Sequence, residues 1–172
     1  MPGPHLPYFP PLRKMMHQPR VEQATLEDLP QLTDLLVALF EQEPDFTPDR
    51  AKQMRGLRLV LENPARGRIF VLRQHGVIIG MINLLFTIST AEGGFVMLLE
   101  DLVIGANHRG HGFGRILMDH AIAYAKEKGF LRITLLSDVS ETESQKFFQQ
   151  YGFVKSRMIP MRLVLATPAA TP

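Results

Sequence analysis

Apolar residues recur with the helical period in three segments, roughly residues 27–40, 49–62 and 112–128. The first segment shows this most clearly, through Leu29, Leu32, Leu35, Leu36 and Leu39. Thr25 precedes the first segment as a helix cap, Asn63-Pro64 closes the second, and Gly129 closes the third. The pattern therefore predicts three amphipathic helices, and the Ser140–Glu143 capping box predicts a fourth, short one that ends near Tyr151.

Other segments carry the composition of β-strands. Arg68–Arg73 and Val77–Ser89 are strand-like and are separated by Gln74-His75-Gly76, which predicts a hairpin. Gly93–Ile104 is apolar on both faces at its centre, as in a strand covered on each side. Shorter strands are expected near Val21 and Ala24, over Leu131–Ser137, and over Phe153–Leu165, where Pro160 indicates an edge or a bulge in the last strand or pair of strands.

The order of these elements is β-α-α-β-β-β-α-β-α-β. It predicts a mixed α/β (α+β) fold with one largely antiparallel sheet of about six to seven strands and helices on both faces. We expect one domain over residues 20–165, a proline-rich disordered tail over 1–19, and a frayed end over 166–172.

Composition excludes several classes of protein. The 172 residues contain 19 Lys and Arg against 17 Asp and Glu, a surplus too small to indicate nucleic-acid binding. The absence of cysteine excludes disulfides and thiolate chemistry, and the six histidines have no metal-site spacing. No apolar run is long enough to span a membrane, and no secretory signal is recognisable. We therefore expect a cytoplasmic protein without a metal.

The chemistry-bearing motif is Arg109-Gly110-His111-Gly112-Phe113-Gly114, between the apolar strand and the third helix. Alternate glycines let the backbone approach a ligand and adopt positive φ angles, and the helix start adds free N–H groups. Together these features predict a phosphate site.

Two nucleotide-binding interpretations fit this loop poorly. The glycine spacing is not that of the dinucleotide fingerprint, and the Lys-Ser/Thr pair of a P-loop is missing. A tight turn without a ligand is a further interpretation, in which Arg109 is a surface charge beside a helix start.

The loop also resembles the R-x-x-G-x-G/A signature of the GNAT acyl-CoA N-acyltransferases. Glu100-Asp101-Leu102-Val103-Ile104 resembles the E-x-L-x-V strand of that family, and Phe147–Phe153 resembles its closing F-Y-x-x-x-G-F segment. The resemblance covers roughly residues 20–165. It implies a GNAT-like fold and acetyl-CoA (coenzyme A) as co-substrate.

The resemblance implies roles for two sets of backbone groups. Amides of the loop, in Arg109, Gly110, His111, Gly112, Phe113 and Gly114, would hold the pyrophosphate of coenzyme A. The strand would splay around Leu102, Val103 and Ile104 and leave N–H groups for the pantetheine arm and the thioester carbonyl.

Glu100 is the candidate base, since burial on a central strand would raise the pKa of its carboxyl toward a useful range. A structural carboxylate paired with Arg or Lys is the alternative. Asp101 is the neighbouring candidate, and only one of the two can face the acceptor unless a bulge intervenes.

The proton donor is a point of departure from the family. Phe148 occupies the position where the family often has the tyrosine that protonates the thiolate. Phenylalanine cannot donate a proton, so either Tyr151 or water serves instead.

The expected activity is transfer of acetyl from acetyl-CoA to a primary amine of a small molecule or peptide, by direct attack in a ternary complex. A non-catalytic acyl-CoA-binding sensor is the alternative. The acidic loop with Glu41, Glu43, Asp45 and Asp49 would suit a cationic acceptor, or be a solvated surface. Phe46, Phe86 and Phe95 would line an apolar wall or belong to the core. We expect neither a nucleic-acid nor a membrane partner, and a homodimer is the assembly to test.

Overall fold

The computed structural model describes residues 18–42, 47–138, 140 and 142–165. The two predicted tails, apart from Gln18 and Pro19, and the loop residues Glu43, Asp45 and Phe46 lie outside this range. The chain divides into two compact units, Met1–Leu136 and Ser137–Pro172. The first unit contains the sheet and the glycine-rich loop.

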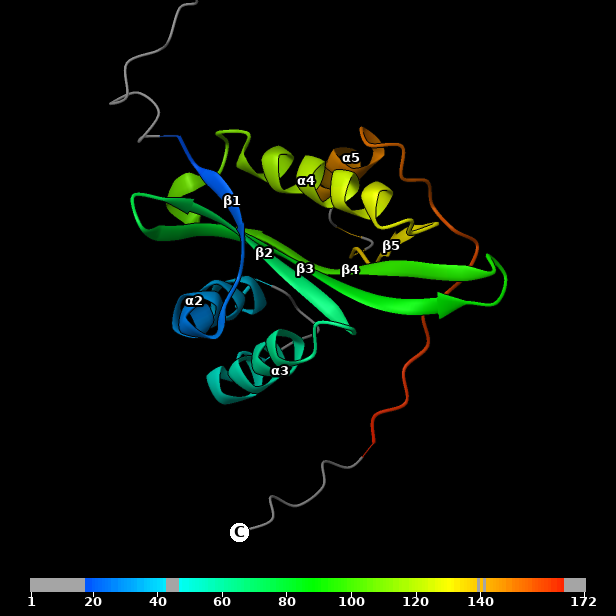
Figure 1. The fold of residues 1–172 in the computed structure, drawn as a ribbon, viewed down its shortest axis with the longest axis horizontal. Helices are drawn as coiled ribbons and strands as arrows, with labels where there is room; N and C mark the ends of the chain where they lie inside the picture. The colour runs from blue at the N-terminus through cyan, green and yellow to red at the C-terminus, as the bar shows by residue number, and fades with distance from the viewer. Residues whose placement is uncertain (1–17, 43–46, 139, 141, 166–172) are drawn as a thin grey trace, which may run out of the picture. The chain divides into compact units, whose positions relative to one another are not determined.

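The sheet of the first unit has five strands in the order β1-β2-β3-β4-β5 (Figure 1). They are β1 (Arg20–Gln23), β2 (Gly67–Gln74), β3 (Val77–Ser89), β4 (Gly94–Ile104) and β5 (Ile133–Leu135). Neighbouring strands are antiparallel except for β4 and β5, which run parallel. The predicted mixed and largely antiparallel sheet is confirmed, but its strand count is five rather than six to seven.

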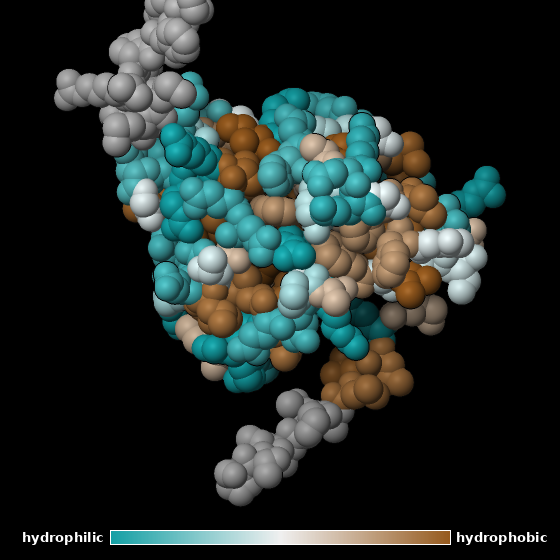
Figure 2. All heavy atoms as spheres, viewed as in Figure 1, coloured by the Kyte–Doolittle hydropathy of each residue, from teal (hydrophilic) through white to brown (hydrophobic). Residues whose placement is uncertain are grey.

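The difference in strand count arises after β4. The strand expected over Leu131–Ser137 is reduced to the three residues of β5, and residues 153–165 form no strand although all of them are described. Local composition favours a strand, but a strand also needs a neighbouring edge with which to pair. Figure 2 shows hydrophobic side chains gathered along the end of this segment, where Met161, Leu163 and Val164 are exposed.

The hairpin between β2 and β3 follows the prediction. Gln74 pairs with Val77, so the turn consists of His75 and Gly76, with φ angles of 51° and 79°. Two successive positive φ angles match the right-handed twist of the strands that the turn joins.

Helices cover both faces of the sheet, as expected (Figure 1). α2 (Leu29–Phe40), preceded by the 3-10 turn η1 (Leu26–Asp28), and α3 (Arg50–Glu62) lie on one face. Their leucines form a buried core with sheet residues. The core comprises Ala24, Leu29, Leu32, Leu36, Leu57, Ile69, Val71, Ile78, Met81 and Val103.

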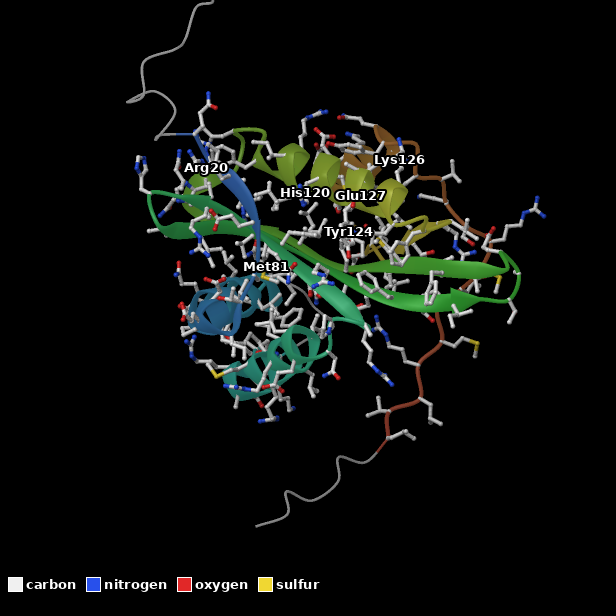
Figure 3. The ribbon with its side chains drawn as sticks, viewed as in Figure 1. Arg20, Met81, His120, Tyr124, Lys126 and Glu127 are labelled. Atoms are coloured by element: carbon white, nitrogen blue, oxygen red, sulfur yellow. The ribbon has the colours of Figure 1, made fainter. Side chains whose placement is uncertain are left out.

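α4 (Phe113–Glu127) covers the opposite face. Its buried residues are Leu117, Met118, Ala121 and Ala125. His120 and Tyr124 point from α4 toward the sheet (Figure 3) and meet the ring of Phe70 at 4.5 and 5.1 Å between centroids. Phe86 packs on Tyr124 and Phe130, and Phe95 reaches Phe130, so both belong to the aromatic packing on this face.

The second unit contains α5 (Thr142–Gln149), which lies within the predicted short helix. Within this unit, the ring of Phe148 contacts those of Phe147 and Phe153, and Tyr151 contacts Phe147 at 5.4 Å between centroids. The side-chain amide of Gln145 donates to the Asp138 carbonyl and ties α5 to the chain that precedes it.

Candidate functional site

The glycine-rich loop connects the end of β4 to the start of α4 in the first unit. It begins with the 3-10 turn η2 (Ala106–His108), and Gly110 and Gly112 follow with φ angles of 77° and 78°. A Cβ atom added to either glycine would meet nothing within 4 Å, so glycine is required by backbone conformation rather than by crowding. Gly114 differs from the other two, because it already lies within α4.

Gly112 is the N-cap of α4. The Arg115 N–H donates to the Gly112 carbonyl at 3.1 Å, whereas the N–H groups of the first helical residues, Phe113 and Gly114, have no intrahelical acceptor. The positive end of the helix dipole lies at the same place. The predicted combination of left-handed glycines and a helix start is therefore present.

The Arg109 side chain holds the loop in position. Its Nε donates to the Ile104 carbonyl at 3.0 Å, and Nη1 donates to Gln42 Oε1, also at 3.0 Å. Gln42 in turn donates to the Ala38 carbonyl of α2. Arg109 is exposed near the start of α4, as in the alternative of a surface charge, and it links the loop to the end of β4 and to the end of α2.

Two histidines, His111 within the loop and His108 before it, lie near Phe113. His111 stacks on Phe113 with 5.8 Å between ring centroids, and its Nδ1 lies 2.8 Å from the Arg109 carbonyl. The ring of His108 also lies near Phe113, at 6.5 Å between centroids. These contacts fix Phe113 at the first turn of α4.

A β-bulge interrupts β4 a few residues before the strand ends at Ile104. Asn83 of β3 pairs with Asp101, and the next residue, Leu84, pairs with Leu99, so Glu100 has no partner on β3. A bulge places two residues of one strand opposite one residue of the other. Because of this bulge, the side chains of Glu100 and Asp101 need not point to opposite faces of the sheet.

The two acidic residues at the bulge have opposite environments. Glu100 is exposed, whereas Asp101 is 8% exposed and its Oδ2 accepts a hydrogen bond from Asn83 Nδ2 at 2.9 Å. The expectation that Glu100 is buried is wrong, because the bulge turns it toward solvent.

β4 separates from β5 beyond the bulge. The parallel pairing of these strands ends at Leu99–Leu135, while Leu102, Val103 and Ile104 continue to pair with β3. The Gly105 N–H donates to the Ile79 carbonyl of β3, and successive residues of a strand alternate direction. The N–H groups of Leu102 and Ile104 therefore face away from β3, on the side where β5 has ended.

Sequence reasoning missed one functional candidate, Asn83. It is a buried polar residue that interrupts the apolar run of β3, and this interruption was the available signal. Its partner Asp101 is 18 positions away in sequence, so the pairing depended on the register of the hairpin.

The acidic loop divides between described and undescribed residues. Asp49 caps α3, where its carboxylate accepts the Lys52 N–H, and this hydrogen bond lowers the pKa of Asp49. Glu41 is exposed at the C-terminal cap of α2. Asp49 therefore has a structural role, as the N-cap of α3.

The sequence profile of the Acetyltransferase (GNAT) family matches residues 29–153, which include strands β2 to β5, the bulge and the glycine-rich loop. This chain belongs to the GNAT acetyltransferase family. No curated protein sequence matches it.

Solved structures share the GNAT fold. A possible acetyltransferase from Clostridium difficile 630 superposes with a TM-score of 0.79 at 10% identity, over 87% of this chain and 99% of that one. An aminoglycoside acetyltransferase from an uncultured soil metagenomic sample, in complex with sisomicin, gives 0.70 at 21% identity, over 86% and 97%. A ribosomal-protein-alanine N-acetyltransferase from Brucella melitensis biovar Abortus 2308 gives 0.66 at 16% identity, over 86% and 99%.

The predicted GNAT site residues fall into both units. Glu100, Leu102–Ile104 and the loop from Arg109 to Gly114 belong to the first unit, on one continuous segment of chain. Tyr151 belongs to the second unit, two residues after the end of α5. The donor role of Tyr151 stays a prediction from sequence.

Two further properties of this GNAT chain concern its described residues alone. None of the helices there combines the length and apolar character that crossing a bilayer requires. Over the same residues, no three His, Asp or Glu side chains are grouped as a metal site.

Proposed function

We propose that this GNAT protein is a cytoplasmic N-acetyltransferase that moves acetyl from acetyl-CoA to a primary amine of a small molecule or peptide. Family membership supports an acyltransferase. The observation that carries the finer proposal is the loop with Gly110 and Gly112 at positive φ angles, joined by a short stretch of chain to a strand that has separated from its neighbour.

The loop would bind the pyrophosphate of acetyl-CoA. Backbone N–H groups between Arg109 and Gly114 provide donors, and the open space at Gly110 and Gly112 admits an anion close to the backbone. The Arg109 guanidinium is already engaged by Ile104 and Gln42, so its main contribution would be to hold the loop.

The separated part of β4 would bind the pantetheine arm and the thioester. The N–H groups of Leu102 and Ile104, which face away from β3, would donate to pantetheine and to the thioester carbonyl. Donors aimed at a carbonyl oxygen that becomes negatively charged stabilise the tetrahedral intermediate.

The transfer itself needs a neutral amine. Its nitrogen attacks the thioester carbon, the new C–N bond forms, and the C–S bond breaks with release of coenzyme A. Glu100 is the proposed base that takes a proton from the amine, and its exposure allows that proton to pass to solvent. The thiolate takes a proton from Tyr151 or from water.

An alternative function is a non-catalytic acyl-CoA-binding sensor. Phe148 favours this alternative, because it lies where the family often has a tyrosine and its ring packs against Phe147 and Phe153. Both functions require acetyl-CoA binding, but only the enzyme releases free thiol when an amine is added.

A panel of amines with thiol detection tests the proposed function. It should include sisomicin, 1,4-diaminobutane and an alanine-initiated tripeptide, since the structural neighbours include enzymes named for an aminoglycoside and for ribosomal-protein alanine. We expect amine-dependent thiol release with at least one class. Binding of acetyl-CoA without release across the panel would favour the sensor.

A further inference from the structure

In the buried pair Asn83–Asp101 at the β4 bulge, the Asn83 Oδ1 atom has no hydrogen-bond donor among the described residues. Asn83 is 5% exposed and Asp101 is 8% exposed. Asn83 Nδ2 donates to Asp101 Oδ2 at 2.9 Å, but Asn83 Oδ1 is buried and accepts no hydrogen bond from any described residue. An unsatisfied buried carbonyl oxygen is costly, so its retention requires an explanation.

The orientation of this amide follows from chemistry. An ionised carboxylate has only acceptor atoms, so the NH2 end of Asn83 must be the end that faces Asp101. The carbonyl end is thereby directed to the other side, and it can be satisfied only by a donor from outside the described protein. The pair therefore presents a carbonyl oxygen beside a carboxylate, which is a combination suited to an ammonium group.

The pair lies on the face of the sheet that α2 and α3 cover. Asn83 is two residues from Met81, and Asp101 is two residues from Val103, and both of these apolar residues belong to the core beneath those helices. Figure 3 labels Met81 on this side. Glu100, the chain neighbour of Asp101, is exposed at the same bulge.

The pair also adjoins the proposed thioester site. Asp101 is followed directly by Leu102, whose N–H faces away from β3 beyond the end of β5. A strand rises about 3.3 Å per residue, so a group bound by Asp101 lies within a few ångströms of that N–H along the strand.

We propose that Asn83 and Asp101 form the subsite for the acceptor amine, as a primary ammonium group that donates to Asn83 Oδ1 and is neutralised by the Asp101 carboxylate. This inference rests on the proposed function and assigns its specificity: a compact cationic amine is preferred to a neutral or tertiary one. Glu100, at the exposed edge of the bulge, then receives the proton when the amine becomes a nucleophile.

A binding measurement on the wild-type protein tests the subsite directly. The protein is labelled with ¹⁵N, saturated with coenzyme A and titrated with 1,4-diaminobutane, while the side-chain NH2 signals of Asn83 are followed by NMR. Their loss in Asn83→Leu identifies them. We expect saturable shifts with 1,4-diaminobutane and none with 1,4-butanediol, which has the same carbon chain without a charge. Unmoved Asn83 signals, as expected for a permanently bound water, would overturn the proposal.

Kinetics with the best acceptor of the amine panel provide a second test. Asn83→Leu keeps the branched shape of the side chain and removes the carbonyl oxygen together with the NH2 group that donates to Asp101. It should raise KM for the amine about tenfold or more, since a hydrogen bond to a charged group is lost. The acetyl-CoA Kd should not change. An unchanged amine KM in a folded variant would contradict the subsite.

Leu84→Val is the matched control, because Leu84 is buried next to Asn83 on β3 but points to the opposite face. It should lower stability without raising the amine KM. If Asn83→Leu does not fold, the wild-type titration still decides. Failure of the proposed function has a different signature, since the wild type would then release no thiol from acetyl-CoA with any amine of the panel.

Discussion

At the scale of single residues, the chemistry and the stability of the protein depend on where three carboxylates lie. Glu100 is exposed at the bulge, Asp101 is buried against Asn83, and Asp28 is buried at the start of α2. Their positions relative to the sheet differ, and so do the roles we assign: Glu100 is the proposed proton acceptor, Asp101 the proposed amine partner, and Asp28 a structural anchor held by Arg73 and Thr25.

The role of Glu100 predicts a specific kinetic defect. Glu100→Gln should lower kcat at neutral pH about a hundredfold, because general-base catalysis contributes at least that factor. The acetyl-CoA Kd should stay unchanged, and the slope of rate against pH that reports the base should disappear. Glu62→Gln, an exposed glutamate of α3 paired with Arg58, serves as the control and should be fully active. An unaltered pH–rate profile in Glu100→Gln would remove Glu100 from the mechanism.

Asp28 predicts a pH-dependent contribution to stability. Burial alone would raise the pKa of Asp28, but the hydrogen bonds from Arg73 and Thr25 and the charge of Arg73 more than offset it, so the pKa is lowered. This stabilisation is complete above the unfolded carboxyl pKa of about 4 and is lost as pH falls through the lower folded-state value. Asp28→Asn should therefore cost about 2 kcal/mol at pH 7 and less in acid.

Denaturant unfolding at pH 7 and pH 3 checks this prediction. Asp34→Asn is the matched control, because Asp34 pairs with Arg50 on the exposed surface and such pairs contribute little. Equal losses in the two variants at pH 7 would contradict the assignment of Asp28 as an anchor.

At the scale of elements, the loop and the strand before it were predictable to different degrees. The turn into α4 could be predicted from glycine spacing, because positive φ angles strongly favour glycine, and Gly110 and Gly112 adopt them. The bulge at Glu100 could not, since a bulge depends on how β3 and β4 pair rather than on the composition of either. Asn83 was missed for the same reason.

Replacing Gly112, the left-handed N-cap of α4, should weaken the binding of coenzyme selectively. Gly112→Ala forces a Cβ into the left-handed region, costs about 1–2 kcal/mol and displaces the amides of the loop. Acetyl-CoA Kd should rise about tenfold or more. Gly129→Ala imposes the same strain at the C-terminal end of α4, where φ is 72°, and should reduce stability without changing that Kd. Similar affinities in the two variants would refute the assignment of the loop.

Replacing His75 in the turn between β2 and β3 with asparagine should stabilise the protein. His75 has a φ of 51°, which asparagine tolerates better than histidine, and the sequence Asn-Gly is preferred at such turns. His75→Asn should raise the free energy of unfolding by about 0.5 kcal/mol, measured by thermal or denaturant unfolding. A loss of stability would mean that another contact of His75 outweighs the turn.

At the scale of the whole molecule, the sequence predicted the class of fold better than its extent. The helical periods, the hairpin and the covered central strand predicted one mixed sheet between helices, because each burial pattern is local. The strand expected over 153–165 did not form, because pairing requires an edge that local composition does not supply. The donor role of Tyr151 stays a prediction that Tyr151→Phe tests through kcat.

The central claim is that the loop from Arg109 to Gly114 binds the pyrophosphate of acetyl-CoA. Isothermal titration calorimetry of the wild-type protein with acetyl-CoA, with Gly112→Ala and Gly129→Ala in parallel, tests it most directly. We predict saturable binding at one site, weakened in Gly112→Ala and unchanged in Gly129→Ala. Absence of any binding by the folded wild-type protein would contradict the claim, and would leave the loop as a structural turn.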